Sequence, residues 1–354
     1  MKNNLEQFES TEAFIGYMQQ TARSILDKLI PNHAEIILLD YPNNTNVGDS
    51  LIWLGTLAYL NSRGLKISYV CDTRNYSFEK LKEKIKTNTI VLMNGGGNFG
   101  TLWDEVHNFR IRAIKDLKNV PIIQLPQTIH FDNQEKVDEI NQVITQHGQF
   151  SLIVRSQYCY DFAKSRFDTN VYLCPDMAFF IGAIKNADQP NIDCIAIART
   201  DIETSGELSS VIENLKNEYA LEKTDWLEAG LAERSLHRIE MHTGLIRKII
   251  DPHNMQLIQL WNSLSTLRLK RGVALLKDAK VVIADRLHVH ILSILLNKPH
   301  VIIDNNYGKL KHFHETWTYR SPSHKYATNP NNVPKLVRNL HQTLTSATTG
   351  YEVR

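Results

Sequence analysis

Three residues near the carboxyl-terminal end of the sequence, Arg286, His288 and Lys309, have side chains that bind anions or move protons. Arg286 and His288 directly follow an apolar run at residues 281–284, and Lys309 follows a second such run at residues 300–303; both runs predict buried strands. Ligands of open α/β sheets bind outside the carboxyl ends of the strands. Two fixed positive charges and an imidazole therefore suit an anionic substrate, such as a phosphate or a carboxylate.

A structural role is the alternative for the same residues. An arginine at a strand end often forms an ion pair, here with Asp285 or Asp304, and a single histidine is often a hydrogen-bonded structural residue. The grouping at the ends of two consecutive strands favours a functional site.

The first half of the chain carries a glycine-rich segment after the predicted strand at residues 89–93. It consists of Asn94, Gly95, Gly96, Gly97 and Asn98. Glycines let the backbone approach a ligand closely, and successive N–H groups before a helix can bind an anion. The segment matches neither GxGxxG nor a P-loop. A tight turn without a ligand remains the alternative.

Other strand ends in this half carry polar or aromatic residues. Asn46, Gly48 and Asp49 precede a predicted helix, where Asp49 is either a helix cap or a hydrogen-bond partner for a sugar hydroxyl. Arg155 follows the strand at residues 151–154 and is suited to a carboxylate. Trp103 either stacks on a sugar ring or packs in the fold.

Metal binding is not expected from the sequence. The pairs His288/His290 and His312/His314 have a spacing that does not place two ligands on one helix face, and no HExxH motif accompanies them. The four cysteines form no CxxC motif, and buried free thiols fit a reducing cytoplasm.

Strands and helices alternate along the chain, which predicts an α/β fold with parallel, doubly wound sheets. The length of 354 residues suggests two domains. The polar segment 186–191 is the expected boundary. We expect a Rossmann-like domain at residues 1–185 preceded by an N-terminal helix, a second at 192–322, and a tail with one helix at 323–354. Residues 207–277 have a mostly helical pattern.

The charge balance of 40 basic against 38 acidic residues argues against a general nucleic-acid binder. We expect neither a signal peptide nor a membrane span, because the sequence has no apolar h-region and no run of about 18 apolar residues. The protein is therefore expected in the cytoplasm. The basic helices of residues 223–277 are either solvated or touch the inner face of the membrane.

Several motifs, taken together and in order, resemble the bacterial polysaccharide pyruvyl transferase family, and most closely its exopolysaccharide-operon members. The likeness extends over about residues 35–317. The motifs are Asn46-Val47-Gly48-Asp49, residues 94–100, Leu125-Pro126-Gln127-Thr128, Val154-Arg155, Pro175-Asp176, Arg199-Thr200-Asp201, Arg286-Leu287-His288 and residues 304–309.

The resemblance implies two Rossmann-like domains facing a cleft, as in GT-B glycosyltransferases. It also implies transfer of a pyruvyl group from phosphoenolpyruvate to two hydroxyls of a sugar, with a cyclic ketal and phosphate as products. The expected donor residues are Arg155, Arg286, Lys309 and residues 94–98, with His288 and Arg286 catalytic. The expected acceptor residues are Asn46, Gly48, Trp103, Arg199 and Asp49, the last also a candidate base.

Phosphoenolpyruvate would be a co-substrate, and neither a cofactor nor a metal is expected. The acceptor would be a nucleotide- or lipid-linked sugar of cell-surface glycan synthesis. Two alternatives stay open: a GT-B glycosyltransferase that uses a nucleotide-sugar, and a non-catalytic carbohydrate-binding subunit.

Overall fold

The computed structural model describes residues 6–185, 189–198, 207–227, 229–242, 255–304 and 308–349. The chain forms two compact units. The N-terminal unit comprises residues 18–181 and 229–268, and the C-terminal unit comprises residues 1–17, 182–228 and 269–354. Each unit is described by itself, and each contains one parallel sheet.

This division differs from the expected ranges 1–185, 192–322 and 323–354. Residues 229–268 belong to the N-terminal unit because Leu257, Trp261 and Leu264 pack in its core. Residues 323–354 are not a separate tail, because their strand β12 (His324–Ala327) pairs with the sheet of the C-terminal unit.

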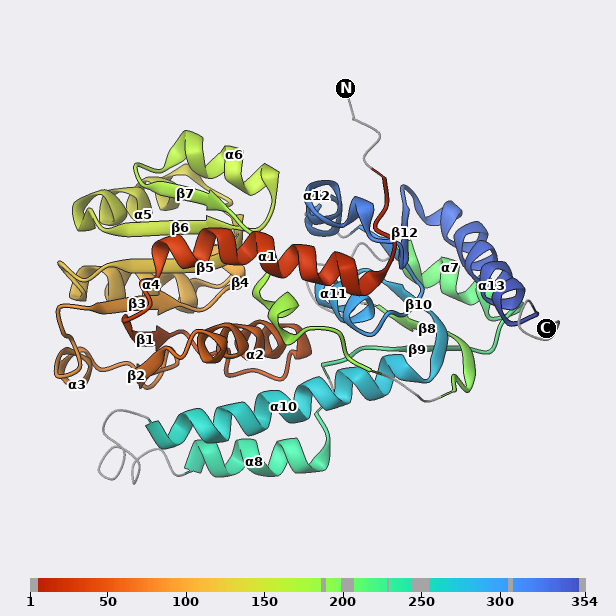
Figure 1. The fold of residues 1–354 in the computed structure, drawn as a ribbon, viewed down its shortest axis with the longest axis horizontal. Helices are drawn as coiled ribbons and strands as arrows, with labels where there is room; N and C mark the ends of the chain where they lie inside the picture. Colours follow the sequence, from red (N-terminus) through yellow and green to blue (C-terminus); the bar gives the residue numbers. More distant parts are fainter. Residues whose placement is uncertain are drawn as a thin grey trace. The chain divides into compact units, whose positions relative to one another are not determined.

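The sheet of the N-terminal unit has the order β2-β1-β3-β5-β6-β7, with β4 beside β5, and its paired strands are parallel (Figure 1). Its strands are β1 (Glu35–Leu39), β2 (Lys66–Val70), β3 (Thr89–Met93), β4 (Gly96–Gly100), β5 (Ile122–His130), β6 (Phe150–Val154) and β7 (Asn170–Leu173). Several strands are buried on both faces, which explains their nearly continuous apolar sequence.

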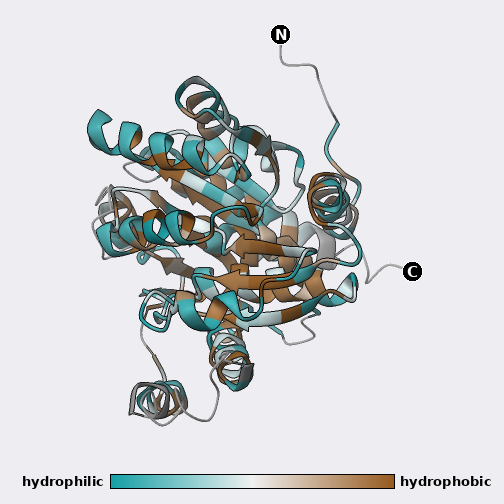
Figure 2. Cartoon of the chain, turned by 90° about the vertical axis from the view of Figure 1, so that its left-hand side faces the viewer, coloured by the Kyte–Doolittle hydropathy of each residue, from teal (hydrophilic) through white to brown (hydrophobic). Residues whose placement is uncertain are grey.

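Helices cover both faces of this sheet. Side chains of α4 (Asp104–Asp116), α5 (Gln134–His147) and α6 (Gln157–Arg166) join one core, and those of α1 (Thr11–Leu29), α2 (Val47–Ser62) and α10 (Met255–Lys277) join the other. Among the described residues of this unit, the other helices are α3 (Phe78–Lys82), α8 (Leu231–His242) and the 3-10 helix η1 (Met177–Ile181). Hydrophobic residues are concentrated in the strands and on the helix faces that meet them (Figure 2).

The sheet of the C-terminal unit has the order β12-β11-β10-β8-β9, and all its pairs are parallel. Besides β12 it contains β8 (Ile192–Ile197), β9 (Leu221–Thr224), β10 (Ala279–Ala284) and β11 (His300–Ile303). Its helices are α7 (Glu207–Leu215), α11 (Leu287–Leu295), α12 (Lys309–Thr316), α13 (Val333–Thr349), η2 (Thr318–Arg320) and η3 (Pro330–Asn332). Side chains of α7 and α13 pack on one face of the sheet.

Both units are Rossmann-like, and three of their strands differ from the sequence interpretation. Strand β9 lies in the segment predicted to be mostly helical, β12 lies in the predicted tail, and β4 occupies much of the predicted glycine turn. All three are short, and β4 contains three glycines, so none shows the β-branched run by which strands are recognised.

The chain reverses its direction of sheet growth once in each unit. Strand β1 has β2 on one side and β3 on the other, and β8 has β9 on one side and β10 on the other. Such topological switch points are where open α/β sheets bind ligands, at the carboxyl ends of the two strands. The loops after β1 and β3, and those after β8 and β10, are therefore the places to search for a site.

Gly55 of α2 provides a test of the packing in the N-terminal unit. A Cβ atom at this position would lie 2.0 Å from the carbonyl oxygen of Met177 in η1. We expect Gly55→Ala to lower the free energy of unfolding by about 1–3 kcal/mol, because backbone rather than a flexible side chain blocks the added methyl group.

The matched control is Gly16→Ala in α1, where a Cβ would meet nothing within 4 Å. That change should stabilise the protein by about 0.5–1 kcal/mol through the helix propensity of alanine. Urea denaturation measures both variants, and equal stability of the two would contradict the packing described for α2 and η1.

Candidate functional site

Arg286 lies at the switch point of the C-terminal unit. It is the N-cap residue of α11, is separated from the end of β10 by Asp285 alone, and is only 3% exposed. Its guanidinium donates a hydrogen bond to Oδ2 of Asp225 at 2.7 Å, and Asp225 directly follows β9. This ion pair between the buried Arg286 and the partly buried Asp225 orients the guanidinium at the carboxyl ends of the strands.

His288 and Lys309 lie at the same edge of this sheet. His288 is in the first turn of α11 and is 9% exposed, and Lys309 is the first residue of α12, which follows β11. Oδ1 of Asp304 accepts hydrogen bonds from the backbone N–H groups of Leu310 and Lys311, so the end of β11 is tied to the start of α12. Two cationic residues and one histidine thus lie at the carboxyl ends of the neighbouring strands β10 and β11, as the sequence predicted.

Asp225 was missed by the sequence interpretation. The expected ion-pair partners of Arg286 were Asp285 and Asp304, which are neighbours in sequence or on the next strand. Asp225 reaches Arg286 because β9 is the outer neighbour of β8 in the sheet. The strand that carries it, Leu221-Glu222-Lys223-Thr224, has no apolar run that would have revealed it.

At the switch point of the N-terminal unit, the loop after β1 is held by its own side chains. Asn46 caps α2, because its side-chain oxygen accepts a hydrogen bond from the N–H of Gly48 at 2.9 Å. Oδ2 of Asp49 accepts hydrogen bonds from Nδ2 of Asn44 at 2.9 Å and from Nδ2 of Asn46 at 3.3 Å. Asp49 is therefore a positioned carboxylate rather than the N-cap of the helix.

The glycine-rich segment after β3 lies beside that loop, because β1 and β3 are paired up to Leu39 and Met93. A Cβ at Gly95 would lie 2.7 Å from the carbonyl oxygen of Pro126, and Gly96 has a φ of +152°. Both positions therefore require glycine. Gly96, Gly97 and Asn98 belong to β4, so the segment is part of the sheet as well as a loop.

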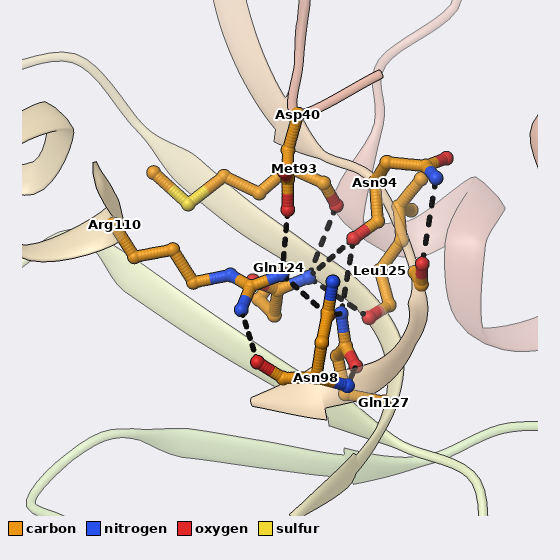
Figure 3. Close-up of polar contacts among 9 residues, drawn as sticks. Asp40, Met93, Asn94, Asn98, Arg110, Gln124, Leu125 and Gln127 are labelled. Atoms are coloured by element: carbon orange, nitrogen blue, oxygen red, sulfur yellow. Dashed lines mark hydrogen bonds and ion pairs between the residues drawn. The ribbon is translucent and has the colours of Figure 1, made fainter. Parts of the chain in front are cut away.

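A network of polar contacts holds this segment (Figure 3). One η nitrogen of Arg110 donates to the backbone oxygen of Asn98 at 2.6 Å, and the other donates to Oδ1 of Asn98 at 2.8 Å and to Oδ2 of Asp40 at 2.6 Å. Nε2 of Gln127 donates to the backbone oxygen of Asn94 at 3.1 Å and to Oδ1 of Asn98 at 3.0 Å. Nε2 of Gln124 donates to the same Asn94 oxygen at 2.9 Å.

The Asp40–Arg110 pair has unusual electrostatics. Burial raises the pKa of Asp40 to about 6, an effect that the neighbouring Arg110 opposes and that Asp49 and Asp72 reinforce. Burial also lowers the pKa of Arg110. Asp40 has a φ of 68°, a backbone conformation that is uncommon outside glycine. Neither residue was predicted; the only sequence signal was an acidic residue directly after a strand.

The remaining predicted residues are distributed over the N-terminal unit and beyond the described segments. Arg155 is 2% exposed, donates from Nε to Oγ1 of Thr128 at 2.8 Å, and forms an ion pair with Asp176. Trp103 precedes α4 and is 51% exposed, so its ring is available for stacking. Arg199 lies outside the described residues. The structure thus groups Asn46, Gly48, Asp49 and residues 94–98 on one sheet edge of this unit.

Comparison with known proteins identifies the family. The sequence matches the profile named polysaccharide pyruvyl transferase over residues 46–307. The chain belongs to this family. EpsO of Bacillus subtilis (strain 168), provisionally named a pyruvyl transferase, is 29% identical over 323 residues, which cover 90% of this chain and 96% of EpsO. Pyruvyl transferase 1 of Schizosaccharomyces pombe is 26% identical over 296 residues, covering 80% of this chain and 70% of that protein.

A solved structure supports the fold independently. A crystal structure of a protein of uncharacterised function from Klebsiella pneumoniae superposes with a TM-score of 0.57 at 22% identity, covering 88% of this chain and 98% of that one. At this level of identity the likeness concerns the fold alone. In the part of this chain that the structure describes, every helix is too short or too polar to cross a bilayer.

Proposed function

We propose that the protein transfers the pyruvyl group of phosphoenolpyruvate onto two hydroxyls of a sugar to form a cyclic ketal, in the synthesis of a cell-surface glycan. The proposal rests on the positions of Arg286, His288 and Lys309, which lie at the carboxyl ends of strands β10 and β11 in the C-terminal unit. Membership of the pyruvyl transferase family gives the reaction class. The donor, the ketal product and the biosynthetic context are parts of the proposal.

Phosphoenolpyruvate is a three-carbon molecule whose carboxylate and phosphate groups are both bonded to its central carbon. Arginine binds such planar or tetrahedral oxyanions through paired N–H donors, and lysine contributes a compact positive charge. We assign these roles to Arg286 and Lys309. The ion pair with Asp225 holds the guanidinium of Arg286 in place before the donor binds.

His288 is the proposed general acid. Protonation of the methylene carbon of the enol phosphate leaves an oxocarbenium-like carbon that is attacked by the first sugar hydroxyl, which loses its proton. The carbon–oxygen bond to phosphate then breaks, and the second hydroxyl attacks and releases its proton. One proton ends on the new methyl group and one is released with phosphate, so the reaction needs neither an oxidant nor a reductant.

The acceptor residues are proposed on the N-terminal unit. Asp49, held by Asn44 and Asn46, is a positioned carboxylate that can accept a hydroxyl proton. The exposed ring of Trp103 offers a stacking surface for a sugar. Asn46 and Gly48 stay predicted acceptor residues, and residues 94–98 stay predicted donor residues. Arg199 stays a predicted acceptor residue, and Arg155 a predicted donor residue. The contacts of Arg155 with the partly buried Thr128 and the buried Asp176 equally support a structural role.

The deciding experiment measures phosphate release from phosphoenolpyruvate by the purified wild type with a panel of lipid- and nitrophenyl-linked sugars. We expect release that depends on the acceptor, and thermal stabilisation by phosphoenolpyruvate even without one. Thermal stabilisation by nucleotide-sugars with nucleotide release, and none by phosphoenolpyruvate, would instead indicate a glycosyltransferase. Sugar binding that survives His288→Ala, with turnover of neither donor, would indicate a non-catalytic subunit.

A further inference from the structure

Three buried histidines lie together inside the C-terminal unit. His290 is on α11, and His300 and His324 are the first residues of the neighbouring strands β11 and β12. Their exposed fractions are 0%, 0% and 4%. One ring nitrogen from each of the three lies within 4.8 Å of the other two. His300 and His324 are also paired in register, so both side chains leave the same face of the sheet.

One nitrogen of each ring has a hydrogen-bond partner outside the three histidines. Nδ1 of His300 bonds the backbone oxygen of Lys298 at 2.7 Å, and Nε2 of His290 bonds Oγ1 of Thr318 at 2.9 Å. Nε2 of His324 bonds Nδ1 of His314 at 3.0 Å. Metal-ligating histidines are usually oriented in this way, by a hydrogen bond from the nitrogen that does not bind the metal.

The other ring nitrogens are Nδ1 of His290, Nε2 of His300 and Nδ1 of His324. The first two are 2.7 Å apart, and the third is buried without a hydrogen-bond partner. A shared proton accounts for the contact between His290 and His300, but it leaves the lone pair of His324 buried and unsatisfied. A cation bound by all three nitrogens accounts for every ring nitrogen in the cluster.

We propose that His290, His300 and His324 bind one zinc ion. Three imidazoles suit a borderline transition-metal ion, whereas magnesium and calcium prefer oxygen ligands. Zinc–nitrogen bonds of about 2.0–2.1 Å in tetrahedral geometry separate the nitrogens by about 3.3 Å. His290 and His300 therefore have to move apart by about 0.6 Å from their 2.7 Å contact to admit the ion.

The protonation states favour metal binding. Burial lowers the pKa of His300 to about 4 and holds the pKa values of His290 and His324 well below their usual range. All three rings are therefore neutral at physiological pH, and zinc does not have to displace protons from charged imidazoles.

The ion would stabilise the fold and would take no part in the transfer reaction. It would join α11 to the strands β11 and β12, and α11 carries Arg286 and His288 at its start. The proposal differs from the expectation that no metal is bound. That expectation weighed the sequence pairs His288/His290 and His312/His314, whereas the cluster takes its ligands from three separate elements.

The test measures zinc in protein purified without a polyhistidine tag, by elemental analysis. We expect about one zinc ion per chain in the wild type and in His33→Gln, an exposed-histidine control, and loss of the zinc in His324→Gln. X-ray absorption at the zinc edge should show nitrogen ligands at about 2.0–2.1 Å.

A second measurement covers the case in which the variant fails to fold. Chelator-treated wild type should gain about 5 °C or more in its melting temperature when zinc is returned, and should gain nothing with magnesium. Metal-free wild type whose stability zinc does not change would overturn the proposal, as would zinc retained at full stoichiometry by folded His324→Gln. The result is independent of which reaction the protein catalyses.

Discussion

Replacing His288 by alanine is expected to lower acceptor-dependent phosphate release from phosphoenolpyruvate by about 10²–10⁴-fold, the usual contribution of a general acid. The change removes the group that protonates the methylene carbon but leaves Arg286 and Lys309 in place. Binding of the donor should therefore persist. The measurement combines steady-state phosphate release with the thermal shift produced by phosphoenolpyruvate, and only the first should be lost.

The control for this prediction is His33→Ala, which removes an exposed histidine before β1. It should retain wild-type turnover. If His288→Ala keeps its turnover within a few-fold of the wild type, His288 does not transfer the proton. If it loses the thermal shift as well, the side chain holds the donor rather than acting as the acid.

The second large effect is expected from Arg110→Met, which should lower the free energy of unfolding by about 3–5 kcal/mol. The substitution leaves the carboxyl group of Asp40 buried without its cationic partner and removes three hydrogen bonds to Asn98 and Asp40. Urea denaturation at neutral pH measures the loss. A loss below about 1 kcal/mol would mean that water or a rearranged loop replaces the guanidinium.

A double-mutant cycle separates the ion pair from the rest of the network. Asp40→Asn combined with Arg110→Met should cost less than the sum of the two single changes, because the double variant buries no unpaired charge. Additive costs would show that the two charges do not interact.

The same pair predicts a pH dependence. The folded pKa of Asp40, about 6, exceeds its ordinary value of 3.8, so its contribution to stability is full below about pH 4 and is lost as the pH rises through 6. Asp40→Asn should remove this dependence, and Arg110→Met should increase it.

Much of the fold was predictable because buried parallel strands appear in the sequence as short runs of β-branched and other apolar residues. Residues 35–40, 89–93 and 281–284 were assigned to strands in this way, and the structure confirms them as β1, β3 and β10 within two residues at each end. Arg286, His288 and Lys309 were predicted for the same reason, since each closely follows a recognisable strand. The grouping of the loops after β1 and β3 follows from the strand order, which sequence pattern alone did not give.

The residues that were missed depend on neighbours that are distant in sequence. Asp225 is 61 residues from Arg286, and its strand β9 is a polar edge strand. Arg110 lies on an amphipathic helix, where an arginine is ordinarily a solvated residue, yet the network with Asp40 and Asn98 buries it. His290 and His300 are in contact because β11 lies beside β10 in the sheet. The helix α11, which follows β10 in the sequence, packs against β11. No local pattern encodes such meetings.

The division of the chain between the two units has a consequence for its synthesis on the ribosome. The last strand of the N-terminal sheet ends at Leu173, but Trp261 and Leu264, which complete that unit's core around Tyr41 and Trp53, emerge roughly 90 residues later. At ordinary translation rates the delay is roughly 5–20 s. During this time the part of the core that α10 covers, around Tyr41 and Trp53, stays incomplete in the nascent chain.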